Sequence, residues 1–250
     1  MTLRFFDVNI AVGRPRNEPL FEPLTTPGDL KALLDEKGLQ GALIWHWAQS
    51  EGHPESGNAL IEPFRKATEN LTICWSILPP LTDEQGDVLE RMRQANVKAV
   101  RLFPQSHRYP MNRVAWGDLL GTLSDCRVPV LLSLENGCGW DHIYSLLDDY
   151  PNLTCILCDT GTWSMDRLFY PLLDRFPNVH IETSMVSITD GGVEATASRF
   201  GASRLVFGSG FPRRYVEAAA LQLAHADLAE DDRQAIAADN IQRLLGEASL

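Results

Sequence analysis

The sequence predicts an α/β protein: a single (β/α)8 TIM barrel that occupies residues 1–250 as one domain. About eight apolar segments of strand length alternate with segments whose apolar residues recur at helical spacing, and short connections join them. The strand segments are almost entirely apolar, as is typical of parallel strands covered on both faces. Eight such units in 250 residues, with 44% hydrophobic content, match the usual size of a barrel.

The main alternative to a barrel is an open, doubly wound sheet. Such a sheet commonly carries Gly-x-Gly-x-x-Gly after its first strand, and this motif does not follow residues 5–9. The chain also contains no low-complexity segment or linker that would divide it. The sequence therefore favours one closed barrel over an open sheet or two domains.

In the first half of the chain, proline and glycine mark where the elements end. The first strand ends at Gly13-Arg-Pro15, the third at Pro79-Pro80 and the fourth at Pro104, because proline has no N–H to donate to a sheet. Thr26 followed by proline is typical of a helix start. These signals predict strands at 5–9, 41–46, 72–78 and 97–103, helices at 26–34, 58–68 and 83–94, and a polar loop at 48–56.

The second half repeats this alternation and ends with a strand, a glycine turn and a helical stretch. Gly208-Ser-Gly210 follows the last apolar run and lets the backbone turn tightly, because glycine has no Cβ to clash. A long helical stretch is expected after Pro212, ending at 239–246. The pattern predicts strands at 129–135, 153–158, 179–184 and 205–207, and helices at 116–123, 140–147, 165–176 and 193–200.

Composition argues against several classes of partner. A net charge of -11, with no dense basic cluster, disfavours nucleic acid. No apolar run approaches the roughly 18 residues that a membrane helix needs, and an acidic residue interrupts the first seven before a secretory signal could form. The 5 cysteines are an odd number, and several lie in apolar segments, which indicates reduced thiols. We therefore expect a cytoplasmic protein with a small-molecule ligand and no nucleic-acid or membrane partner.

The active site of a β/α barrel lies at the carboxyl ends of its strands, so polar residues there are the candidates. We expect three of them to be catalytic: His46, Glu135 and Asp159. We expect six to bind substrate: Asn9, Trp75, Arg101, Ser133, Glu182 and Ser209. Ser209 lacks the Gly-x-Ser-x-Gly context of a nucleophile elbow, so a role as nucleophile is not expected.

The residue pattern leaves alternatives open for several of these candidates. His46 lies between two tryptophans and is either a general base or a histidine packed among aromatic rings. Arg101 either binds a substrate carboxylate or forms an internal ion pair with Asp7, Glu135 or Glu182, because a buried guanidinium needs a partner.

Asp159 and Glu135 raise a similar choice. If they lie close together, each raises the pKa of the other and they divide the acid and base roles. Otherwise one pairs with Arg101 and the other stabilises a loop. Arg213-Arg214 either binds an anion at a helix start or is solvated. Cys155-Ile-Leu-Cys158 lies inside an apolar strand, so its two cysteines are expected in the core rather than in a redox or zinc site.

Four segments resemble the amidohydrolase-related barrels: Phe6-Asp-Val-Asn-Ile-Ala-Val-Gly13, Val97-Lys-Ala-Val-Arg-Leu-Phe-Pro104, Leu205-Val-Phe-Gly-Ser-Gly-Phe-Pro212 and Asn240-Ile-Gln-Arg-Leu-Leu-Gly246. Members of that family typically bind a divalent metal through His-x-His after strand one, histidines at strands five and six, and an aspartate at strand eight. By this resemblance, the corresponding residues here are Asn9, Ala11, Ser133, Asp159 and Gly210. A catalytic zinc needs about three protein ligands, so the resemblance implies a barrel without the metal site and without a cofactor.

The resemblance implies hydrolysis or lyase chemistry on a small polar, carboxylated metabolite. We therefore expect a metal-independent hydrolase or lyase. One alternative is a catalytically inactive barrel that binds a ligand or a partner, since fold does not determine function. Another is a hydrolase with a relocated metal held by Asp159, Glu135 and His46. Exposed apolar residues on barrel helices commonly support dimers, so a homodimer is also a hypothesis.

Overall fold

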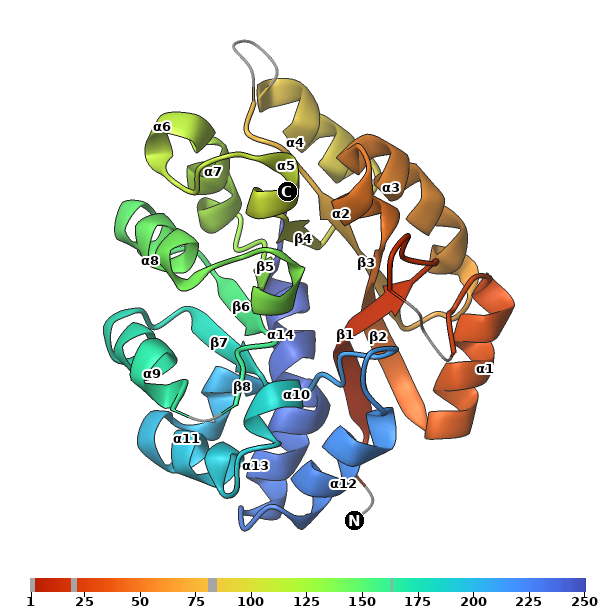
Figure 1. Cartoon of the computed structure of the whole chain (residues 1–250), viewed down its shortest axis with the longest axis vertical. Coiled ribbons are helices and arrows are strands. Elements are labelled where there is room, and N and C mark those ends of the chain that lie inside the picture. Colours follow the sequence, from red (N-terminus) through yellow and green to blue (C-terminus); the bar gives the residue numbers. More distant parts are fainter. Residues whose placement is uncertain (1–2, 19–21, 81–84, 163) are drawn as a thin grey trace.

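A computed structural model describes residues 3–18, 22–80, 85–162 and 164–250, without the side chains of 85–87. Eight parallel strands form one sheet in sequence order, which confirms the predicted (β/α)8 barrel (Figure 1). The barrel closes where the backbone N–H groups of Val8 and Ala11 donate to the carbonyls of Phe207 and Phe211, at 3.0 and 2.9 Å. The strands are β1 (Phe5–Val12), β2 (Leu39–His46), β3 (Leu71–Ser76), β4 (Ala99–Leu102), β5 (Val130–Ser133), β6 (Cys155–Cys158), β7 (Val179–Glu182) and β8 (Leu205–Val206).

Helices lie around the sheet and across the ends of the barrel (Figure 1). They are α1 (Pro27–Lys37), α2 (Ala48–Glu51), α3 (Pro54–Ile61), α4 (Gln85–Gln94), α5 (Pro104–His107), α6 (Arg113–Trp116), α7 (Leu119–Asp125), α8 (Trp140–Asp149), α9 (Asp166–Arg175), α10 (Thr183–Val186), α11 (Gly192–Phe200), α12 (Val216–His225), α13 (Glu230–Gln234) and α14 (Asn240–Glu247). As predicted, Thr26 caps α1: its hydroxyl accepts from the Asp29 N–H at 3.1 Å. None of the described helices has the length and apolar character needed to cross a membrane.

Alternation along each strand divides the apolar residues between two layers. Leu43, Leu131 and Ile156 belong to the cluster inside the barrel, whereas their neighbours Ile44 and Leu132 pack between the sheet and the helices. A step of one residue along a strand therefore moves a side chain from the barrel centre to the outer layer. Cys155 and Cys158 are buried free thiols in β6, which confirms that they are core residues.

The predicted loop at 48–56 was wrong, because this segment contains α2 and the start of α3. The signals were His53 and Pro54: the His53 side chain accepts from the N–H of Glu55, and proline occupies the first helical turn. The predicted helix at 58–68 is the end of α3 followed by a 3-10 turn at Glu62–Lys66.

Other expected elements also differ from the structure. The stretch after Pro212 is not one helix but α12, α13, a π-helical segment at Ala235–Asp239 and α14. Strands five and seven end two residues earlier than expected. As a result Glu135 lies in a 3-10 turn, and Ser184 lies in α10.

Candidate functional site

Polar side chains fill the barrel centre at the carboxyl ends of the strands. We call six of them the central cluster: Asp7, Asn9, Arg101, Ser133, Asp159 and Glu182. Each is between 0% and 3% exposed, so its polar atoms must find partners within the protein. The residues come from strands β1, β4, β5, β6 and β7 or the positions just after them, which is where a barrel places its site.

Asp159 connects several residues of the central cluster through hydrogen bonds and ion pairs. Its Oδ2 accepts from the Ser133 hydroxyl at 2.5 Å, and its Oδ1 accepts from the Asn9 amide at 3.1 Å. Two guanidinium groups flank the same carboxylate: Arg214 Nη1 lies 2.9 Å from Oδ1, and Arg101 Nη2 lies 3.7 Å from Oδ2. Two cations therefore flank this buried carboxylate.

The two other carboxyl groups of the cluster hold protons more tightly than usual. Burial is the main cause that raises the pKa of Glu182, and the nearby charge of Asp159 adds to it. Burial also raises the pKa of Asp7 to about 6, although the backbone N–H groups of Asn9 and Ser209 donate to its Oδ1 at 2.9 and 3.1 Å. Both groups can therefore exchange a proton closer to neutral pH than an ordinary carboxyl group does.

Arg101 is fully buried and lies across the barrel centre. Its Nη1 donates to Asn9 Oδ1 at 3.0 Å, and its guanidinium carbon lies 4.5 Å from the centroid of the Trp45 ring. It is thus an internal strut whose partners are Asn9 and Asp159, and the pairing with Asp159 is one of the alternatives that the sequence left open. The stacking on Trp45 adds a contact that a lysine could not reproduce.

A second layer of charge covers the cluster, and we call its residues Glu18, Glu135, Asn136, Arg213 and Arg214 the arginine cap. Arg214 bridges Asp159 and Glu135. Arg213 donates to Glu18 Oε1 and Oε2 at 2.7 Å and to Asn136 Oδ1 at 3.0 Å, and it lies 4.7 Å from the Trp47 ring. The cavity between cap and cluster is only about 10 Å³, roughly enough for one water molecule.

Two of the expected site residues point away from the barrel centre. The His46 ring packs against Gly13 in the outer layer, and its Nδ1 accepts from the Ala48 N–H at 3.0 Å. Burial lowers the pKa of His46. Trp75 also faces outward and donates from Nε1 to Glu62 Oε1 at 3.2 Å. Strand parity explains both positions, because the neighbouring Trp45 and Cys74 are the residues that face the centre.

Ser209 and Glu135 lie at opposite ends of the polar network. Ser209 is buried beneath the cluster, where its backbone N–H donates to Asp7 and its hydroxyl accepts from the Phe211 N–H at 3.1 Å. Glu135 belongs to the arginine cap and pairs with Arg214, so Arg214 separates it from direct contact with Asp159. The sequence shows Arg213-Arg214 after strand eight but does not indicate their partners, and no pattern in it points to Glu18 or Asn136.

The residues at the family's metal positions do not fit a divalent cation. Asn9 and Ser133 use their donors on Asp159, while Ala11 and Gly210 offer no side-chain ligand atom. A Cβ at residue 210 would overlap Arg214 Nη1, so this guanidinium occupies the space of the missing side chain. A metal ion beside Asp159 would also face the positive charges of Arg101 and Arg214. In the described part of the chain, no three residues among His, Cys, Asp and Glu are grouped to hold a metal ion.

The fold and the central cluster define a class: a β/α barrel with a charged polar centre at the carboxyl ends of its strands. The particular family follows from a match of residues 75–246 to the profile of the amidohydrolase family, and the chain belongs to that family. Among proteins with curated descriptions, none matches this chain.

Several solved structures share the fold. An uncharacterised TIM-barrel protein from Bordetella bronchiseptica has 18% identity and a TM-score of 0.75, covering 98% of this chain and 99% of the other. A 2,6-dihydroxybenzoate decarboxylase in complex with 2,6-dihydroxybenzoate has 16% identity and a TM-score of 0.76, again covering 98% and 99%. A dihydroxybenzoic acid decarboxylase from Polaromonas sp. JS666, with bound manganese and 2-nitroresorcinol, has 15% identity and a TM-score of 0.74, covering 100% and 98%.

Proposed function

We propose that this barrel is a hydrolase or lyase that acts on a small carboxylated molecule without a divalent metal at the family's usual position. The observation that carries the proposal is the placement of Asp159 between the guanidinium groups of Arg101 and Arg214, with Glu182 beside it. Fixed cations then supply the positive charge that a metal supplies in the manganese-bound decarboxylase.

In this proposal the arginine cap is the entrance for the substrate. Arg213, Arg214 and Glu135 are partly exposed, at 22%, 19% and 35% of their side-chain surface. Glu135 is the most exposed of the three, so a substrate carboxylate can approach Arg214 from solvent and take the place of Glu135. Once Glu135 is displaced, the substrate carboxylate would accept two hydrogen bonds from the Arg214 guanidinium, and the rest of the substrate would lie next to Asp159.

The carboxyl groups would then supply proton transfer. Decarboxylation requires a proton at the carbon that loses carbon dioxide, and hydrolysis requires one at the leaving group. Asp159 lines the small cavity and is the carboxyl group closest to a molecule bound there. Glu182 would also hold a proton, because burial raises its pKa, and its Oε2 lies 3.3 Å from the backbone nitrogen of Asp159.

The test is a turnover and binding assay with 2,6-dihydroxybenzoate and other small aromatic and aliphatic carboxylates, with chelator or with added manganese. We expect activity that persists in chelator, at least tenfold weaker carboxylate binding in Arg214→Ala, and loss of turnover in Asp159→Asn. Arg199→Ala is the matched control, because Arg199 is 55% exposed and its ion pair with Asp174 lies at the surface. Activity that appears only with a stoichiometric metal ion would overturn the proposal in favour of a relocated metal site.

A second candidate function is a binding barrel without catalysis. It is favoured by the cavity of about 10 Å³, which leaves no room for a substrate unless the cap opens. The same assay separates the two functions: carboxylate binding that depends on Arg214, without turnover of any compound, supports the binding barrel. A homodimer and a cytoplasmic location remain predictions. The apolar side chains of Tyr215 and Leu221 on and beside α12 are 60% and 63% exposed, and light scattering of the purified protein would test the dimer.

A further inference from the structure

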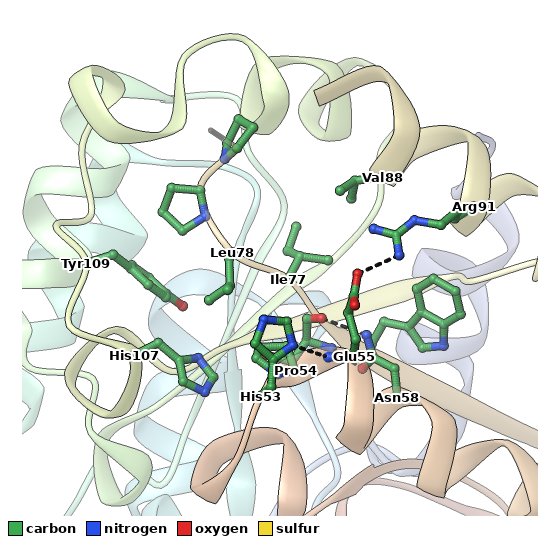
Figure 2. A pocket seen from close by; sticks show the side chains of 14 residues that line it. His53, Pro54, Glu55, Asn58, Ile77, Leu78, Val88, Arg91, His107 and Tyr109 are labelled. Atoms are coloured by element: carbon green, nitrogen blue, oxygen red, sulfur yellow. Dashed lines mark hydrogen bonds and ion pairs between the residues drawn. The ribbon is translucent and has the colours of Figure 1, made fainter. Parts of the chain in front are cut away.

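Two pockets away from the central cluster have the size of sites for small organic molecules, roughly 300–1,000 Å³. One, of about 590 Å³, lies between α3, α4, α5 and the end of β3, and its charged side chains Arg91 and Glu55 already pair with each other at 2.7 Å (Figure 2). The other, of about 430 Å³, lies at the amino-terminal ends of β6, β7 and β8 and extends to the last turns of α14. We call this second one the amino-end pocket, and it is the one that offers unpartnered groups to a ligand.

The amino-end pocket lies at the opposite end of the barrel from the central cluster. Thr154, Asn178 and Arg204 directly precede β6, β7 and β8, whereas the cluster lies where the strands end. Ile241 and Leu244 of α14 pack in the apolar cluster inside the barrel, so α14 covers this end of it. Among the described residues, none lines both this pocket and the small cavity under the arginine cap. A ligand here would therefore bind independently of the function proposed for the cap.

His180 presents an unpartnered acceptor to the amino-end pocket. It is only 5% exposed, and its Nδ1 lies 3.1 Å from the Ser203 carbonyl, which can only accept, so Nδ1 carries the proton. Burial and the nearby charges of Arg204 and Arg243 lower the pKa of His180 to about 3, so the ring is neutral and Nε2 is an acceptor. Within the described chain no group bonds to Nε2, and Nε2 is not among the unpartnered polar atoms that are closed off from solvent. It therefore faces the pocket that His180 lines.

Thr154 supplies a second accessible group next to His180. Cys155 of β6 pairs with Val179 of β7, and both pack in the outer layer, so Thr154 and His180, each one residue away, face inward. Thr154 is 7% exposed, its hydroxyl has no partner among the described residues, and this hydroxyl is likewise not closed off from solvent. A hydroxyl both donates and accepts. A ligand with several hydroxyls can therefore bond to both residues.

Arginines give the amino-end pocket an excess of positive charge. Arg127, Arg204 and Arg243 line it together with two carboxylates, Asp125 and Glu247. Glu247 accepts from Nη1 of Arg127 at 3.4 Å and from Nη1 of Arg243 at 3.1 Å, which leaves the other guanidinium nitrogens of both for a ligand. Arg204 donates to three backbone carbonyls and forms no ion pair with a described carboxylate. In a chain of net charge -11, such a pocket attracts an anion.

These groups together select the ligand. A phosphate monoester has three terminal oxygens and can accept from two guanidinium groups, whereas a carboxylate has two oxygens, which one guanidinium occupies. The neutral ring of His180 needs a donor, and a phosphate dianion has none, so the donor must be a hydroxyl elsewhere on the ligand. Apart from Pro177 and Leu244, the lining side chains are polar or charged, which disfavours an apolar body.

We propose that the amino-end pocket binds a sugar phosphate. The phosphate accepts from Arg127 and Arg243, and hydroxyls of the sugar bond to His180 Nε2 and to the Thr154 hydroxyl. A phosphate ester without hydroxyls leaves the two buried groups without a partner. A sugar acid of similar size cannot engage both arginines equally well.

Three probes test the proposal by calorimetric titration of the full chain: glucose 6-phosphate, methyl phosphate and gluconate. At about pH 8 both phosphate esters are dianions, because their second pKa is about 6. We expect glucose 6-phosphate to bind at least tenfold tighter than methyl phosphate, from two net hydrogen bonds, and gluconate to bind more weakly than glucose 6-phosphate.

His180→Phe keeps an aromatic ring but removes Nε2. It should weaken glucose 6-phosphate binding about fivefold and leave methyl phosphate binding unchanged. Thr154→Val keeps the shape of the side chain and removes the hydroxyl, and it should have the same selective effect, so the hydroxyl contacts are tested even if one variant does not fold. Circular dichroism establishes that each variant is folded.

Arg243→Ala should weaken both phosphate esters at least tenfold. Arg93→Ala is the matched control, because Arg93 is also an exposed helix arginine that pairs with a glutamate one turn away, and it should leave binding unchanged. Arg214→Ala in the arginine cap should also leave glucose 6-phosphate binding unchanged, which separates this site from the proposed function. The proposal is overturned by any of three results: no saturable binding of glucose 6-phosphate, methyl phosphate or gluconate binding as tightly as it does, or equal losses in Arg93→Ala and Arg243→Ala.

Discussion

Arg214 Nη1 lies 2.9 Å from Asp159 Oδ1 and fills the space that a side chain at residue 210 would need. Gly210 also has a φ angle of 72°, a left-handed conformation that glycine adopts without strain. Glycine at 210 and arginine at 214 therefore depend on one another: the absent side chain makes room for the cation that Asp159 requires.

The first prediction concerns this pair. Gly210→Ala should destabilise the protein by roughly 2–3 kcal/mol, because the new Cβ strains the backbone and pushes Arg214 away from Asp159. In an Arg214→Ala background the same substitution should cost only about 1 kcal/mol, since the overlap is gone and only the backbone strain remains. Urea unfolding of the four proteins gives this coupling directly.

Gly246→Ala is a control for the glycine substitution, because a Cβ at residue 246 of α14 meets no atom within 4 Å. It should leave the free energy of unfolding unchanged or raise it slightly. Additive effects of Gly210→Ala and Arg214→Ala would contradict the dependence inferred here.

The second prediction concerns pH. Asp7 has a folded-state pKa of about 6, raised from an ordinary value of 3.8, mainly by burial. Between about pH 4 and 6 the unfolded chain has lost this proton while the folded protein keeps it, so the stability that Asp7 contributes falls as pH rises. This contribution of Asp7 to stability is fully present below about pH 4 and is lost above about pH 6.

Asp7→Asn cannot ionise and keeps an oxygen that can accept from the N–H groups of Asn9 and Ser209. Relative to wild type, the variant should be of similar stability at pH 4 and more stable by roughly 1–3 kcal/mol at pH 7. Urea midpoints measured from pH 4 to 8 test this. Asp35→Asn serves as comparison, because Asp35 is 67% exposed beside Lys31. Parallel pH profiles for wild type and Asp7→Asn would show that Asp7 does not titrate in this range.

The fold followed from the sequence because apolar runs and turn residues are local signals that tertiary packing reinforces. Strand number, parallel order and most helix positions were predictable in this way. The segment at 48–56 was not, because its polar composition hid the helix. What holds α2 and α3 is a long-range network in which Gln49 bonds to Asn58 and to the Cys74 carbonyl, each at 2.8 Å.

The candidate site was predictable only in part. Asn9, Arg101, Ser133, Asp159 and Glu182 meet at the barrel centre, as expected of polar residues at strand ends. His46 and Trp75 also lie at or next to the ends of strands, but their side chains point outward because successive side chains alternate between the two faces of a strand. Composition does not reveal which of the alternating residues face the barrel centre. The partners in the arginine cap join residues far apart in sequence, such as Glu18 and Arg213, and no local pattern indicates such a pair.

The third prediction tests the network that anchors α3 to β3. Asn58 Oδ1 accepts from the Ser76 N–H and the Gln49 amide, and Asn58 Nδ2 donates to the Ser76 carbonyl, all at 2.8 Å. Asn58→Ala leaves these buried groups unpaired and should destabilise the protein by roughly 2–4 kcal/mol. Asn152→Ala, at an exposed turn, should change the free energy of unfolding by less than about 0.5 kcal/mol. Equal effects of the two substitutions would show that the network does not contribute to stability.

The fourth prediction concerns Arg101, whose guanidinium is fully buried between Asn9, Asp159 and the Trp45 ring. Arg101→Met keeps much of the volume but removes the charge, which leaves one of the two cations beside Asp159 and no donor for Asn9 Oδ1. The loss should be about 3–5 kcal/mol, the usual result when one partner of a buried charge network is removed.

Arg101→Lys retains the charge but cannot stack on Trp45 and reach both partners at once, so its loss should be smaller, about 1–2 kcal/mol. Arg199→Met, at a surface pair 55% exposed on both sides, should change stability by less than about 1 kcal/mol. Urea unfolding of the three variants gives the comparison. If Arg101→Met is as stable as wild type, the buried carboxylates do not need this cation, and Arg214 alone must balance their charge.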